Sequence, residues 1–71
     1  MNYMIKDGWH TIQGYKVYVE DGKILRGILG EGNSQRTVYP FRRSKNGWDN
    51  DSGLTVNAFR SGVKRGTVNM F

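Results

Sequence analysis

The stretch "LTVNAFRSGVKRGTVNMF", residues 54–71, decides the fold class of this chain. On a helical wheel its first part places Val56, Phe59 and Val63 on one side. The opposite side carries polar and charged side chains, namely Asn57, Arg60, Ser61, Lys64 and Arg65. This division is typical of a helix that covers a small core with its apolar side.

Both ends of the helical part carry boundary signals. Ser52 or Thr55 stands where a hydroxyl would cap the first turn by accepting a backbone N–H. Gly66 follows two cations, at the position where a left-handed residue commonly ends a helix. We therefore expect a helix within residues 54–65, followed by a short final strand, "TVNMF".

A hairpin competes with the helix over the same residues. Gly62 lies inside the helical stretch, and Val56 and Val63 are β-branched. In this alternative Ser61 and Gly62 form a turn between the strands "LTVNAF" and "VKRGTVNMF". We favour the helix, which predicts an α+β fold with the order β-β-β-α-β. The hairpin predicts a small five-stranded SH3-like barrel instead.

Upstream, "YKVYVEDGKILRGIL", residues 15–29, predicts a β-hairpin, because its Asp-Gly step suits a two-residue type I′ turn. With that turn, Val17 faces Arg26 across the hairpin. Arg26 then falls on the core face, and we expect it to extend to the sheet edge. The predicted core face carries Tyr15, Val17, Val19, Ile24 and Ile28, and the other face carries Tyr18 and Leu25.

The segment "RTVYPFRR", residues 36–43, predicts a third strand, with Pro40 near its end or on an edge because proline cannot donate to a ladder. Alternation puts Thr37, Tyr39, Phe41 and Arg43 on one face and Arg36, Val38, Pro40 and Arg42 on the other. One of these faces must be core. The polar segment 44–53 then predicts a long turn region with Trp48 in its middle. A tryptophan in a loop more often packs over a small core than it contacts a ligand, and both alternatives stay open here.

Length and composition set further limits. A chain of 71 residues is expected to form one domain, residues 1–71, and to bury only about 60% of its unfolded surface. With Cys 0 there is no disulfide to compensate, so homo-oligomerisation remains an open alternative. The sequence shows no apolar run of signal-peptide or membrane-span length, so we expect a cytoplasmic protein with no membrane partner.

The net charge of +5 is unevenly distributed. Residues 1–35 carry four cations and four anions, whereas residues 36–71 carry seven cations and only Asp49 and Asp51 as anions. An excess of positive charge in one half indicates either an anionic partner or a net charge that keeps the protein soluble. The cations of this half are Arg36, Arg42, Arg43, Lys45, Arg60, Lys64 and Arg65.

Catalytic and metal-binding patterns are weak. His10 is the one histidine, and the carboxylate pairs at 20–21 and 49–51 fall in turn segments rather than apolar pockets. A calcium loop starting at Asp49 would need Glu at its last ligand position, where Arg60 stands. We therefore expect a protein that is not an enzyme and that uses neither metal nor cofactor.

The remaining pattern is a basic surface interleaved with aromatic residues in "YPFRRSKNGW" and "AFRSGVKRG". Cations hold the backbone of nucleic acids and flat rings stack on their bases. Our leading hypothesis is binding of DNA or RNA, mainly through phosphate contacts; the alternative is a small regulator that binds an acidic protein partner. The candidate binding residues are the seven cations and Trp48.

Overall fold

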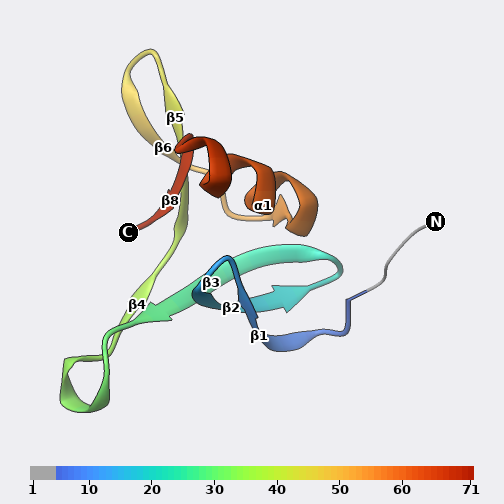
Figure 1. Ribbon diagram of the computed structural model, residues 1–71, viewed down its shortest axis with the longest axis vertical. Coiled ribbons are helices and arrows are strands. Elements are labelled where there is room, and N and C mark those ends of the chain that lie inside the picture. The colour runs from blue at the N-terminus through green and yellow to red at the C-terminus, as the bar shows by residue number, and fades with distance from the viewer. Residues whose placement is uncertain (1–4) are drawn as a thin grey trace.

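The computed structural model describes residues 5–71. Residues 1–4, part of the amino-terminal segment in which we expect no signal peptide, lie outside the described residues. Two antiparallel sheets and one α-helix dominate the fold (Figure 1). The first sheet, β1-β2-β3-β4 with β7 beside β3, comprises β1 (Gly8–Ile12), β2 (Tyr15–Glu20), β3 (Lys23–Leu29), β4 (Arg36–Val38) and β7 (Leu54–Thr55). The second sheet, β6-β5-β8, comprises β5 (Pro40–Ser44), β6 (Gly47–Asn50) and β8 (Val68–Met70). The helix α1 spans Val56–Arg65 and the short 3-10 helix η1 spans Gly32–Ser34.

The predicted helix is confirmed, and with it the α+β fold class. Thr55 is the N-cap, and its Oγ1 accepts from the backbone N–H of Ala58 at 3.2 Å. Gly66 ends α1 in the left-handed conformation, with φ of 80°, which costs glycine no steric clash. The competing hairpin over the same residues, and the barrel that it implied, do not form.

Gly62, which argued against the helix, has a packing role in it. The residue is buried where α1 lies close to β8. A Cβ atom added to Gly62 would lie 2.8 Å from the Cβ of Val68. The glycine therefore lets the helix and the final strand approach each other more closely than any other residue would allow.

The β2–β3 hairpin forms with its predicted turn but with a different register. Asp21 and Gly22 have positive φ angles, as a type I′ turn requires, and Val19 pairs with Ile24 as predicted. A bulge then shifts the register by one residue, so that Val17 pairs with Gly27.

The bulge overturns the predicted positions of two side chains. Arg26 pairs with Tyr18 and lies on the outer face, so the expected cation opposite Val17 is not there. Ile28 pairs with Lys16 and also points outward, although we expected it in the core. The shift leaves Gly27 facing the core, which avoids burying an arginine.

The sequence interpretation missed β1 as a separate strand. Gln13 and Gly14 both have positive φ angles and form a second tight turn, which returns the chain from β1 to β2. The pair Ile12–Tyr15 closes this hairpin, and Ile12 joins the core. Without asparagine or aspartate at the turn, the Gln-Gly step gave no strong hairpin signal.

The predicted third strand is divided between the two sheets. Its first part, β4, pairs with β3, and its second part, β5, lies between β6 and β8. Pro40 begins β5 and is less than 2% exposed, a position where the missing N–H is tolerated. Val38 is also fully buried, so the face of Val38 and Pro40 is the core face.

The expected turn region, residues 44–53, contains a strand instead. β6 pairs with β5 through Trp48 opposite Arg43 and Asp49 opposite Arg42. The predicted turn is confirmed only at residues 45–46, in this hairpin, and at residues 52–53, before β7. Figure 1 shows this hairpin projecting beyond α1. Trp48 therefore sits on a sheet rather than in a loop.

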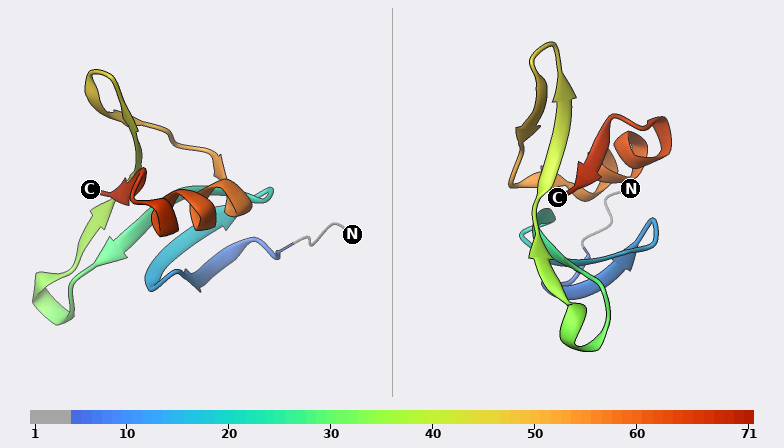
Figure 2. Two further views of the ribbon diagram at one scale, coloured as in Figure 1. Left: turned by 45° about the horizontal axis from the view of Figure 1, so that its top comes forward. Right: turned by 90° about the vertical axis from the view of Figure 1, so that its left-hand side faces the viewer.

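The core lies between α1 and the inner faces of the two sheets. In Figures 1 and 2 the helix crosses one face of the first sheet, with β8 beside it. Phe59 is fully buried, and its ring meets that of Tyr15 edge-on at a centroid distance of 5.9 Å. The other buried apolar side chains are Ile12, Val17, Val19, Ile24, Val38, Leu54, Val68 and Met70.

Replacing Gly62 by alanine tests the close approach of α1 and β8. Alanine improves helix propensity by about 1 kcal/mol, but overpacking against Val68 costs about 1–3 kcal/mol. We expect Gly62→Ala to lower the free energy of unfolding in a urea titration. The control Ser61→Ala, on the exposed side of α1, should change it by less than about 0.5 kcal/mol. A stability gain in Gly62→Ala would contradict the packing.

Candidate nucleic-acid interface

Four aromatic side chains gather on the outer face of the β6-β5-β8 sheet. Phe71 lies at the centre of their contacts, with centroid distances of 5.6 Å to Phe41 and 5.4 Å to Trp48, both edge-on. Tyr39 is paired with Phe71 through both backbone hydrogen bonds, at 2.6 and 3.0 Å. Directly opposed residues in an antiparallel pair share a face, so Tyr39 lies on the same side. We call Tyr39, Phe41, Trp48, Phe71 and Arg43 the first platform.

The platform is largely open to solvent. Tyr39 is 44% exposed, Trp48 37% and Phe71 46%, while Phe41 is half-buried. A group of exposed aromatic rings on a small protein commonly marks an interaction surface. Trp48 contacts Phe71 on this face and is not among the side chains that pack against the main core, which was one of the two positions that we considered for it.

Arg43 is the cation of the first platform. It stands directly opposite Trp48 in the β5–β6 register and two residues from Phe41 on the same face. Its backbone N–H donates to the Thr67 carbonyl at 2.8 Å, which fixes β5 against the segment that follows α1. Arg43 is exposed and therefore shares the outer face of β5 with the aromatic residues.

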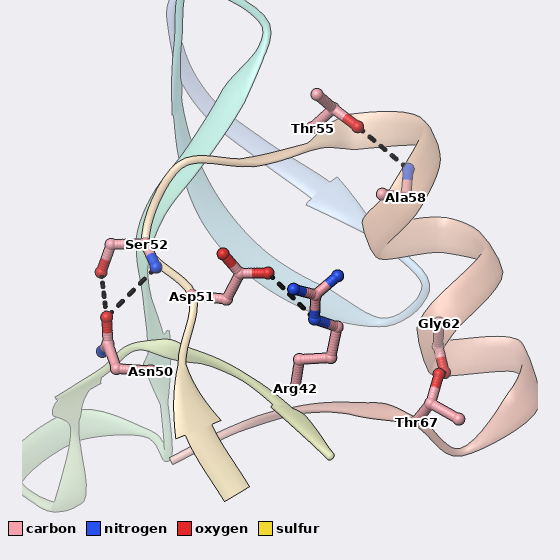
Figure 3. Close-up of polar contacts among 8 residues, drawn as sticks. All are labelled: Arg42, Asn50, Asp51, Ser52, Thr55, Ala58, Gly62 and Thr67. Carbon is pink, nitrogen blue, oxygen red and sulfur yellow. Dashed lines mark hydrogen bonds and ion pairs between the residues drawn. The ribbon is translucent and has the colours of Figure 1, made fainter. Parts of the chain in front are cut away.

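Arg42 lies on the opposite face of β5, which separates it from Arg43. Its Nε is 3.4 Å from the Asp51 Oδ2 (Figure 3). Within residues 5–71 this is the only ion pair. Asp49 lies opposite Arg42 in the β5–β6 register. Two nearby carboxylates offset the charge of Arg42, so it contributes less attraction for phosphate than Arg43 does.

The other predicted cations lie at three places. Lys45 occupies the tip of the β5–β6 hairpin, and Arg36 lies on β4 opposite Leu29. On α1, Lys64 and Arg65 are exposed in the last turn, near the helix C-terminus whose dipole they complement. Because Thr67 meets β5, this end of the helix adjoins the first platform.

Arg60 belongs to a different surface. It borders a cavity of about 680 Å³ between β1 and the first half of α1, together with His10, Thr11, Asn57 and Val56. The His10 Nε2 donates to the Lys6 carbonyl at 2.6 Å, since a carbonyl can only accept. Among the described residues, His10 and Arg60 are the ionisable side chains that line this cavity.

The structure thus divides the predicted site. Alternation correctly places Tyr39, Phe41 and Arg43 on one face, and β6 brings Trp48 to them. Sequence reasoning missed Phe71. Val68 and Met70 of the final strand are buried, so alternation places Phe71 on the same outer face as the other three rings. Arg42 and Arg60 lie elsewhere.

Comparisons with protein-family models, with curated proteins and with solved structures found no match for this chain. Among residues 5–71 there is no helix with the length and apolar character to cross a membrane. Nor does the same part of the chain gather three side chains of the kinds that hold a metal ion.

A double-mutant cycle tests the first platform. Edge-on aromatic pairs contribute about 0.5–1.5 kcal/mol beyond their buried area, so Trp48→Ala and Phe71→Ala should show a coupling of that size in urea unfolding. Trp9, on the first sheet, provides the matched control with Phe71. That pair should be additive within about 0.5 kcal/mol. Additive effects of Trp48 and Phe71 would contradict the contact.

Proposed function

We propose that this protein binds single-stranded nucleic acid on the first platform, without catalysing a reaction. The observation that carries the proposal is the sharing of one exposed sheet face by Tyr39, Phe41, Trp48, Phe71 and Arg43. Bases stack on exposed rings, and a cation beside the rings attracts the phosphate backbone.

The shape of the platform favours a single strand over a duplex. Rings on an open sheet are accessible to unpaired bases, whose flat faces are hidden within a double helix. The helix α1 is a poor candidate for groove entry, because its inner side is packed on the core through Phe59 and its cation Arg60 borders a cavity. We therefore expect unpaired bases to stack on the exposed rings while cations contact the phosphates.

Cations next to the platform extend the electrostatic surface. Lys45 at the hairpin tip and Lys64 and Arg65 at the end of α1 are exposed. Each cation that neutralises a phosphate releases a counterion, which makes binding salt-dependent. An acidic protein partner is the second candidate, since exposed tryptophan and arginine also anchor protein interfaces.

The proposal predicts unequal effects of two neighbouring arginines. The measurement is fluorescence anisotropy of a labelled oligothymidylate of about 12 nucleotides, titrated at two or more salt concentrations. Arg43→Ala should weaken binding and reduce the slope of log affinity against log salt by about 0.7. Arg42→Ala, the matched control on the opposite face, should change the affinity by no more than about twofold.

Trp48→Ala extends the test to stacking. Loss of one stacked base costs about 1–3 kcal/mol, so the Kd should rise by about 5- to 150-fold. A labelled duplex of the same length should bind more weakly. No binding at low salt would refute the proposal and favour an acidic protein partner, whereas tighter binding of the duplex would refute the stacking mode.

A further inference from the structure

The outer face of the first sheet carries a second set of aromatic and cationic side chains. Trp9 on β1 pairs with Tyr18 on β2, and Tyr18 pairs with Arg26 on β3. These three residues form a row across neighbouring strands on one face. Lys16 lies two residues before Tyr18 on the same face. We call Trp9, Lys16, Tyr18 and Arg26 the second platform.

The side chains of this row are in contact. The Trp9 and Tyr18 rings meet edge-on at a centroid distance of 5.4 Å, and the Arg26 Cζ lies 4.5 Å from the Tyr18 centroid. The Lys16 Nζ lies 6.0 Å from the Trp9 centroid. A guanidinium plane held on a ring is itself a surface on which a nucleobase stacks. Trp9 is 43% exposed and Lys16 is exposed, whereas Tyr18 and Arg26 are half-buried.

The bulge in β3 creates this platform. It moves Arg26 from the core face to the outer face, opposite Tyr18. Arg26 then adds positive charge beside the Tyr18 ring, and Lys16 adds a second cation beside Trp9. By the same alternation Glu20 lies on this face at the end of β2, opposite Lys23 in register, and the Asp7 carboxylate accepts from the backbone N–H of Asp21 at the turn. The row itself thus carries two cations that can contact a polyanion, and the acidic side chains lie beyond it at the β2–β3 turn.

The extended segment that runs from β4 into β5 connects the faces that carry the two platforms. Thr37 on β4 is in register with Ile28, which is in register with Lys16. From Thr37 the alternation continues through Tyr39 to Phe41, because Val38 and Pro40 between them are buried. One extended segment of chain therefore joins the outer faces of both sheets.

We infer that one nucleic-acid strand crosses both platforms, an inference that rests on the proposed function of the first platform. The molecule measures 35 × 33 × 18 Å along its principal axes. At the ~3.4 Å spacing of a stacked strand, about ten nucleotides span the longest dimension. An oligonucleotide of that length reaches both platforms, and the second contact becomes intramolecular once the first has formed.

The two tryptophans of the chain, one on each platform, make the inference testable. Trp9→Phe leaves Trp48 as the sole tryptophan reporter, and Trp48→Phe leaves Trp9. Both substitutions keep an aromatic ring, so the fold is retained. Each variant is titrated with the oligothymidylate of about 12 nucleotides, and tryptophan quenching, anisotropy and stoichiometry are recorded.

We expect both reporters to be quenched with the same midpoint, at one oligonucleotide per chain. Arg26→Ala should weaken binding at least about fivefold, because it removes a stacking plane and a cation, whereas Arg42→Ala should leave it within about twofold. Circular dichroism of each variant verifies that the fold is intact.

The remaining outcomes separate the two hypotheses. Quenching of Trp48 alone would overturn the second platform and leave the proposed function standing. Quenching of Trp9 alone, or two oligonucleotides per chain, would overturn the single crossing strand. No quenching and no anisotropy change with either variant would overturn the proposed function, and the inference with it.

Discussion

The structure depends on the extended segment from Arg36 to Ser44, which belongs to both sheets. Its first part pairs with β3 and its second part with β6 and β8, and the change of partners occurs at Tyr39 and Pro40. Because proline lacks an N–H, Pro40 fits the start of a strand better than its middle. The alternation of side chains persists through the change, so Val38 and Pro40 are buried while Tyr39 remains exposed.

That alternation also organises the candidate site. Adjacent residues of β5 point to opposite faces, which sends Arg43 to the aromatic surface and Arg42 to Asp51. The local charge of the sequence is thus split into one arginine beside exposed rings and one arginine beside carboxylates. Net charge alone does not distinguish these two environments.

Two glycines determine how closely the layers approach. Gly62 allows α1 to rest against Val68, which brings β8 into the sheet next to β5 and places Phe71 between Phe41 and Trp48. Gly27 faces the core near Met70, where the register without a bulge would have put Arg26. The aromatic contacts on both outer faces therefore follow from packing on the inner faces.

By itself, the sequence determined those features that depend on neighbouring residues. The Thr55 cap, the Gly66 terminus, the Asp21-Gly22 turn and the alternation along residues 36–43 rest on backbone dihedrals and side-chain period, which act over a few residues. Only the tertiary structure decided the bulge in β3, the strand β6 and the gathering of Phe71 with Trp48. These features depend on pairing and packing between segments far apart in the chain, and burial of an unpaired arginine costs more free energy than the roughly 1 kcal/mol that local β-propensity supplies.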